Sequence, residues 1–192
     1  MKKRLENKVI AVLMADGFEE IEFTVPREAL IEDGAEVCII SPSDSFVKAW
    51  NKDRWGTPYK VDISLADASP GDYDALLLPG GVMNPDNLRT NQQAIDFITA
   101  FFNAGKPVAA ICHAPQLLIE AGVVADRQLT SYPAIKTDLI NAGAQWRDAE
   151  VVLDDGLVTS RSPDDLEAFN RQMIETFSEF HTLGVRPAAG VL

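Results

Sequence analysis

Hydrophobic residues gather along this chain in short runs that are almost free of polar interruption. Four such runs occupy residues 8–14, 35–41, 74–80 and 107–113. A strand that is buried on both faces of a parallel sheet has this pattern, because neither of its faces meets water. The four runs therefore predict four strands of a parallel sheet.

Apolar residues at helical spacing lie between and after these runs. Residues 94–101 and 166–180 repeat apolar side chains at intervals of three and four, which places them on one face of a helix. Pro26 is expected in the first turn of an earlier helix, where a missing backbone N–H is tolerated. Strands and helices alternate, so we predict an α/β fold with a mostly parallel central sheet that is covered by helices on both faces.

Two segments depart from this alternation. Residues 42–73 are mixed in character and rich in turn-forming residues, which predicts an inserted hairpin or lid. Trp50 and Trp55 within it either line a pocket or subunit interface, where tryptophan is enriched, or pack inside the hairpin itself. Residues 150–160 hold two short β runs around an Asp-Gly pair, which is a typical hairpin signal.

The chain is expected to form one domain over residues 1–192. Its length suits a single hydrophobic core, and it contains no internal repeat. Residues 181–192 are expected to be a loosely docked or interface-forming tail. The first apolar run is followed by an acidic segment rather than a cleavage site, and no apolar stretch approaches the ~20 residues of a membrane span, so neither a secretory signal nor a membrane is expected.

Charge and cysteine content limit the partners further. Lys and Arg number 17 against 29 Asp and Glu, which gives a formal net charge of −12 at pH 7. No basic stripe could follow a phosphate backbone, so we expect no nucleic-acid partner. Cys38 and Cys112 are too few for a disulfide framework and lack the paired spacing of a zinc site, which indicates a cytoplasmic protein without a metal. Cys38 lies inside an apolar run and is expected in the core.

One segment combines a buried strand, a sharp turn and the start of a helix. The fourth apolar run leads directly into Cys112 and His113, and Pro115 then opens a helical pattern. A nucleophile in such a turn lies beyond the end of the sheet and beside the N-terminus of a helix. Exposed N–H groups and the helix dipole there stabilise a thiolate, so the sequence predicts that the pKa of Cys112 is lowered.

The loop after the third apolar run supplies candidate donors to a developing oxyanion. Gly80 and Gly81 stand there, and glycine lets the backbone approach a ligand closely. Their N–H groups, together with that of His113, could hold the negative oxygen of an adduct. This loop and the cysteine turn both follow strand ends, where ligands of open parallel sheets bind.

Three glutamates crowd the turn after the first apolar run. Glu19, Glu20 and Glu22 are expected at the same edge of the sheet as the cysteine. One of them could hydrogen-bond the thiol, and nearby negative charge would raise its pKa until the carboxyl group donates a proton. The alternative for such residues is a solvated carboxylate in the first turn of a helix, which we assign to Glu20.

These motifs resemble, in order and spacing, the PfpI family of intracellular cysteine proteases and stress proteins. The similar segments are ADGFEEIE, YDALLLPGGVMNPDNLR, KPVAAICHAP, LTSYPAIKTDLINAGA and LVTSRSPDDLEAF. That family is related to the Parkinson-linked protein deglycase and, more distantly, to class I glutamine amidotransferases. The resemblance implies a flavodoxin-like three-layer α/β/α sandwich in which Cys112 is the nucleophile, Glu22 is the acid that touches its sulfur, and Glu19 lies nearby.

The resemblance also implies how the site is completed. In the protease-like branch the histidine after the cysteine, which is His113 here, is oriented by an acidic residue of a neighbouring subunit, and by position this would be Asp86. A homo-oligomer, a dimer or larger, is therefore expected, with a peptide or a small molecule as substrate and no cofactor. Residues 150–165 contain no histidine, which argues against glutamine amidotransferase activity.

Two functions are compatible with these residues. In the first, the protein is a stress-response cysteine hydrolase in which Cys112 attacks the carbonyl carbon of a peptide, a glycated group or a small aldehyde such as methylglyoxal. In the second, it is a non-catalytic redox sensor or chaperone-like stress protein whose Cys112 is oxidised to a sulfinic acid beside Glu22. A reactive, accessible thiol suits oxidation as well as catalysis.

Overall fold

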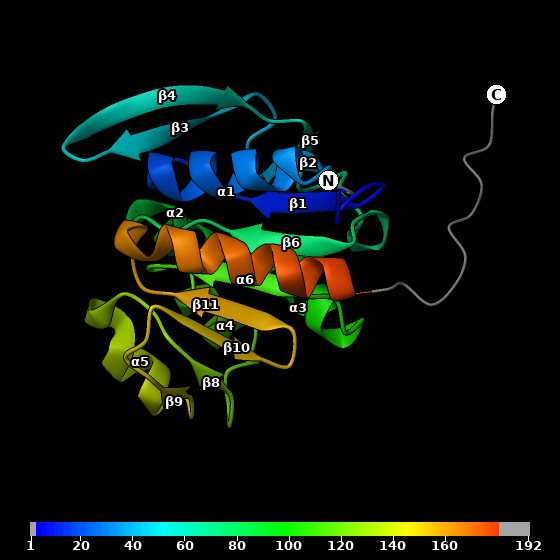
Figure 1. The fold of residues 1–192 in the computed structure, drawn as a ribbon. Helices are drawn as coiled ribbons and strands as arrows, with labels where there is room; N and C mark the ends of the chain where they lie inside the picture. The colour runs from blue at the N-terminus through cyan, green and yellow to red at the C-terminus, as the bar shows by residue number, and fades with distance from the viewer. Residues whose placement is uncertain (1–2, 181–192) are drawn as a thin grey trace.

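Seven strands form the central sheet of the computed structural model, which describes residues 3–180. They are β1 (Val9–Leu13), β2 (Glu36–Ser41), β5 (Ile63–Ser64), β6 (Ala75–Leu78), β7 (Val108–Ile111), β10 (Val151–Asp154) and β11 (Leu157–Ser160). Their order across the sheet is β10-β11-β7-β6-β1-β2-β5, as Figure 1 shows. All neighbours are parallel except β10 and β11, which form the predicted antiparallel hairpin. The four predicted strands are confirmed as β1, β2, β6 and β7.

Helices cover both faces of this sheet, which confirms the predicted three-layer arrangement. They are α1 (Glu20–Glu32), α2 (Met83–Arg89), α3 (Gln92–Asn103), α4 (Gln116–Glu120), α5 (Lys136–Asn141) and α6 (Leu166–Glu179). Short 3₁₀ turns span Pro70–Asp72, Pro133–Ile135 and Pro163–Asp165. Helices α1 and α6 pack together on one face, and α2 to α5 contribute to the core on the other. No helix within residues 3–180 is long and apolar enough to cross a membrane.

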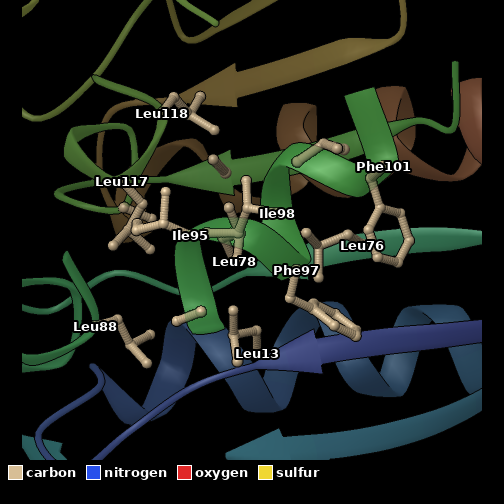
Figure 2. Packing of buried hydrophobic residues seen from close by; sticks show 14 of the residues in the cluster. Leu13, Leu76, Leu78, Leu88, Ile95, Phe97, Ile98, Phe101, Leu117 and Leu118 are labelled. Carbon is tan, nitrogen blue, oxygen red and sulfur yellow. The ribbon is translucent and has the colours of Figure 1, made fainter. Parts of the chain in front are cut away.

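Side chains of each central strand alternate between the two cores. Ile10 and Val12 of β1 belong to the core under α1 and α6, whereas Ala11 and Leu13 belong to the opposite one. Figure 2 shows the second core, in which leucine side chains of the sheet meet the apolar face of α3. Both faces of the strand are therefore covered by helices, which explains why the sequence shows continuous apolar runs rather than alternation.

The inserted segment contains a two-stranded hairpin outside the central sheet. Strand β3 (Phe46–Asn51) pairs with β4 (Arg54–Lys60) in antiparallel fashion, and both lie beside α1 (Figure 1). Backbone hydrogen bonds attach the hairpin to the loop after β1: the Gly17 N–H donates to the Lys48 carbonyl at 2.8 Å, and the Trp50 N–H donates to the Phe18 carbonyl at 2.7 Å. A shorter parallel pair, β8 (Gln128–Leu129) and β9 (Gln145–Trp146), lies apart from the main sheet.

The position of Pro26 differs from the one predicted. Helix α1 already begins at Glu20, so Pro26 lies within the helix and the prediction that it stands in the first turn was wrong. The glutamates of the first turn interact favourably with the helix dipole, which helps the helix begin earlier than its proline. The predicted tail, residues 181–192, lies outside the described residues.

Leu76 tests the packing of the core. Its side chain is fully buried between β6 and α3, so Leu76→Ala should lower the free energy of unfolding by about 3 kcal/mol. Leu153 on β10 is 48 % exposed and serves as the matched control, since Leu153→Ala should cost no more than about 0.5 kcal/mol. Urea denaturation of both variants measures the difference, and equal losses would contradict this packing.

Candidate active site

Cys112 occupies a strained turn directly after β7. Its φ angle is 63°, in the left-handed region that non-glycine residues rarely adopt. Two backbone hydrogen bonds hold the turn: the Cys112 N–H donates to the Ser160 carbonyl at 3.0 Å, and the Tyr132 N–H donates to the Cys112 carbonyl at 2.8 Å. The side chain is 7 % exposed and lines a pocket. Neighbouring strands thus fix the direction of the thiol, and such strain is characteristic of functional positions.

Glu22 lies beside this thiol in the first turn of α1. Its side chain is fully buried, and its Oε2 accepts a hydrogen bond from the Gly80 N–H at 3.1 Å. Its Oε1 has no hydrogen bond of good geometry to any described residue. Burial raises the pKa of Glu22 to about 7, with a smaller contribution from the charge of Glu19, although interaction with Cys112 and Gly80 opposes the shift. Near neutral pH this group can therefore carry a proton.

The same surroundings raise the pKa of Cys112, contrary to the expectation of a lowered value. Burial is the main cause, and the negative charge of Glu22 adds to it. Backbone N–H groups of Gly81 and His113 act in the opposite direction by donating toward the sulfur. Because thiolate and carboxylate repel each other in a buried place, ionisation of one group opposes ionisation of the other, and a thiolate at Cys112 is favoured while Glu22 holds its proton.

The glycine loop after β6 approaches both groups closely. A Cβ at Gly80 would lie 2.5 Å from Glu22 Oε2 and 2.7 Å from the Cys112 Cβ, so no other residue fits there. Gly81 has φ 79°, and a Cβ on it would lie 2.5 Å from the Gly17 carbonyl oxygen. The Gly80 N–H donates to Glu22, whereas the N–H groups of Gly81 and His113 are the donors near the sulfur, that of Gly81 lying near Glu22 as well.

His113 is held against the sulfur by an aromatic neighbour. Its Nδ1 lies 3.2 Å from the Cys112 Sγ, and its ring stacks on Tyr132 with centroids 4.6 Å apart. Burial lowers the pKa of His113, so the ring is neutral at pH 7 and can accept a proton. Asp86 lies exposed on α2 and does not line the pocket, and within the described part of this chain it makes no contact with His113.

The other two glutamates of the turn have different surroundings. Glu19 lines the pocket, and burial raises its pKa. Glu20 points instead to the hairpin, where it accepts hydrogen bonds from the Asn51 amide at 2.8 Å, the Thr57 N–H at 3.2 Å and the Tyr59 hydroxyl at 3.1 Å. These bonds lower the pKa of Glu20. Glu20 is thus a partly exposed carboxylate in the first turn of α1, as expected, and in addition it bonds the hairpin.

Asn84 is a residue that the sequence reasoning missed. Its side chain is fully buried and donates to the carbonyls of Pro79 and Gly80 at 2.8 and 3.1 Å, while its Oδ1 accepts from the Ala15 N–H at 2.7 Å. It therefore ties the glycine loop to the loop after β1. A polar residue three positions beyond the glycine pair could have signalled such a link, but nothing in the sequence shows that its side chain is buried.

The candidate site opens into a pocket of about 490 Å³. Its lining residues are Gly17, Glu19, Glu22, Trp50, Gly81, Val82, Met83, Cys112, His113, Tyr132 and Pro163. Among residues 3–180 no group of three His, Cys, Asp or Glu side chains is arranged to hold a metal ion. The pocket thus presents a thiol, a carboxyl group with a raised pKa, a neutral imidazole and backbone donors within one concave surface.

Residues 8–176 match the model of the DJ-1/PfpI family. The chain belongs to this family. Protein/nucleic acid deglycase 2 of Escherichia coli (strain K12) is 46 % identical over 169 residues, which cover 88 % of this chain and 96 % of the relative. General stress protein 18 of Bacillus subtilis (strain 168) is 44 % identical over 169 residues, or 87 % and 96 % of the two chains. The crystal structure of Drosophila melanogaster DJ-1beta superposes with a TM-score of 0.81 at 31 % identity, covering 89 % of this chain and 90 % of that one.

The shifted pKa of Glu22 predicts how stability depends on pH in this DJ-1/PfpI protein. The folded state holds a proton on Glu22 up to about pH 7, whereas the unfolded chain releases it near 4.5, so this group makes stability fall as pH rises between those values. Glu22→Gln cannot ionise. Its free energy of unfolding, relative to that of wild type, should be about 3 kcal/mol larger at pH 8 than at pH 4.

Urea unfolding at several pH values checks this prediction. Glu20→Gln is the control with the opposite sign, because the hydrogen bonds to Glu20 lower its folded pKa and stabilise the fold above the unfolded pKa. This variant should be less stable than wild type at pH 8, with a difference that shrinks toward pH 4. A pH-independent effect of Glu22→Gln would contradict the assignment of a raised pKa.

Asn84 should matter for stability because it satisfies three buried backbone groups. Asn84→Ala leaves the Ala15 N–H and two carbonyls of the glycine loop without partners, which should cost about 3 kcal/mol of stability. Asn87→Ala on the exposed side of the same helix should cost no more than about 0.5 kcal/mol. Chemical denaturation compares the two, and equal effects would show that the bonds of Asn84 contribute little.

Proposed function

We propose that this DJ-1/PfpI protein is a stress-response cysteine hydrolase whose Cys112 attacks carbonyl carbons of small aldehydes, glycated groups or peptides. The observation that carries the proposal is the buried pair of Cys112 and Glu22, which lies in the wall of a pocket and in which burial raises the pKa of both groups. The names of the Escherichia coli deglycase and the Bacillus subtilis stress protein support the same reaction class and setting. Of these substrates, an aldehyde carbonyl is the simplest probe.

The proposed first step follows from the positions of the groups. With its proton on Glu22, Cys112 is a thiolate, and its sulfur forms a bond to the carbonyl carbon. The π electron pair of the carbonyl moves to its oxygen, where the N–H groups of Gly81 and His113 stabilise the charge. Glu22 then gives its proton to that oxygen, which completes a hemithioacetal with no gain or loss of electrons.

Neutral His113 suits the later proton transfers. Its Nδ1 lies 3.2 Å from the sulfur, so it can remove a proton from the adduct carbon or from an incoming water. For a 2-oxoaldehyde, the overall change adds one water and gives a 2-hydroxy acid. For a peptide, water replaces the amine. We further propose that the protein acts in the cytoplasm as a homo-oligomer, in which Asp86 of a second copy orients His113; its exposed position on α2 leaves it free to do so.

A redox-sensing role is the second candidate, and one observation favours it. A protonated Glu22 beside the sulfur would also donate a hydrogen bond to a sulfinate formed from Cys112 by peroxide. The raised pKa of the thiol works against it, because oxidation proceeds through the thiolate. The two candidates differ in whether the reduced protein turns over a carbonyl substrate.

Turnover of methylglyoxal tests the proposal. We expect kcat/KM to rise with pH through an apparent pKa of about 7, as the Cys112–Glu22 pair loses the first of its two protons. Cys112→Ser should lower kcat/KM by at least about 10³-fold, since an alcohol is a far weaker nucleophile. Cys38→Ala, at the buried second cysteine, should keep the turnover of wild type.

The outcome distinguishes the two candidates. Full turnover by Cys112→Ser with methylglyoxal and with peptides would eliminate the cysteine mechanism. A wild-type protein that turns over neither substrate, but whose Cys112 is converted to sulfinic acid by mild peroxide in mass spectrometry, would instead support the redox sensor.

A further inference from the structure

Among the described residues that line the pocket, Trp50 is the one that comes from the inserted hairpin. Its side chain is held in place by several contacts: the indole Nε1 donates to the Lys52 carbonyl at 2.8 Å, and the ring packs edge-on against Trp55 with centroids 5.5 Å apart. The backbone N–H of Trp50 donates to the carbonyl of Phe18, in the loop after β1, at 2.7 Å. The indole is therefore a fixed part of the pocket wall.

Glu20 holds the hairpin against α1 and so supports this position. Three hydrogen bonds from the hairpin reach its carboxylate, one from β3 and two from β4. The fit is close, because a Cβ at Gly56 would lie 2.5 Å from Glu20 Oε2. Strands β3 and β4, the loop after β1 and helix α1 thus fix the position of Trp50 relative to the sulfur.

The pocket is larger and more apolar than a three-carbon aldehyde requires. Cavities of its size, about 490 Å³, accommodate ligands of drug-like dimensions. Beyond the sulfur and its partners, the wall contains Gly17, Glu19 and five apolar or aromatic side chains: Trp50, Val82, Met83, Tyr132 and Pro163. A substrate with its carbonyl at the sulfur would place the rest of its body among them.

Charge at the pocket excludes one class of carbonyl compound. Glu19 and Glu22 both line it, and the described lining contains no Lys or Arg side chain that could pair with an anion. An ionised 2-oxo acid would therefore meet like charge and lose its hydration without compensation. A neutral molecule meets no such penalty.

We propose that this site prefers neutral 2-oxoaldehydes with an aromatic or similarly large apolar group, and that Trp50 determines this preference. The inference rests on the proposed function, because it names the substrate class of the same cysteine. Aromatic contact adds to the gain from burying apolar surface, so the large group contributes binding that a methyl group cannot.

Initial rates with three substrates test the preference: phenylglyoxal, methylglyoxal and glyoxylate. We expect wild-type kcat/KM for phenylglyoxal to exceed that for methylglyoxal by about tenfold or more, with glyoxylate the poorest. Trp50→Ala should reduce the phenylglyoxal-to-methylglyoxal ratio by about tenfold, chiefly through KM, and Trp50→Phe should keep most of it. Phe46→Ala is the control, since Phe46 lies on the same strand, is 57 % exposed and does not line the pocket.

Binding of acetophenone, measured by calorimetry, separates failure of the preference from failure of the chemistry. If wild type turns over no aldehyde but binds acetophenone, and Trp50→Ala alone weakens binding about tenfold, recognition of an aromatic group by Trp50 stands and the proposed reaction fails. Equal kcat/KM for both aldehydes, or equal effects of Trp50→Ala and Phe46→Ala, would overturn the inference. Absence of both turnover and acetophenone binding would overturn it too. Thermal denaturation verifies that each variant is folded. If Trp50→Ala is not folded, Trp50→Phe takes its place in the comparison.

Discussion

A carboxyl group and a thiol that lie together out of water can carry one negative charge between them but not two. Burial raises the pKa of both Glu22 and Cys112, and the charge of Glu22 raises the pKa of Cys112 further. Ionisation of one group therefore opposes ionisation of the other, and in the proposed reaction the proton held by Glu22 lets Cys112 act as the nucleophile and then completes its attack. The glycine loop after β6 and the strained turn after β7 keep these two side chains adjacent and largely shielded.

The surrounding fold compensates for the backbone strain and the close approach that this arrangement requires. Cys112 adopts an unfavourable backbone conformation because strand β11 and the loop at Tyr132 hold its N–H and carbonyl. The loop after β6 passes so close that only glycine fits at position 80, and buried Asn84 keeps that loop in place. The central strands can bear this strain since their side chains fill two well-packed cores.

The sequence predicts most of the fold but only part of the site. Continuous apolar runs identify buried parallel strands, and the strand–turn–helix order around Cys112 identifies the nucleophile turn. The order of motifs along the chain does not show which atoms are already hydrogen-bonded. The Gly80 N–H was expected to donate to an oxyanion, yet it donates to Glu22. Similarly, a lowered pKa for Cys112 follows from the helix start alone, whereas burial beside a carboxylate, visible only in three dimensions, has the larger effect.

The first turn of α1 connects the chemistry with the choice of substrate. Glu20 and Glu22 are two residues apart, which on a helix turns their side chains about 200° from each other. One accordingly reaches the hairpin that carries Trp50, and the other reaches the sulfur. Because a single helical turn holds both groups, a shift of α1 that moved the acid away from Cys112 would also move the pocket wall. The hairpin can nevertheless change its side chains without altering the pair, so selectivity can vary while the reacting groups stay fixed.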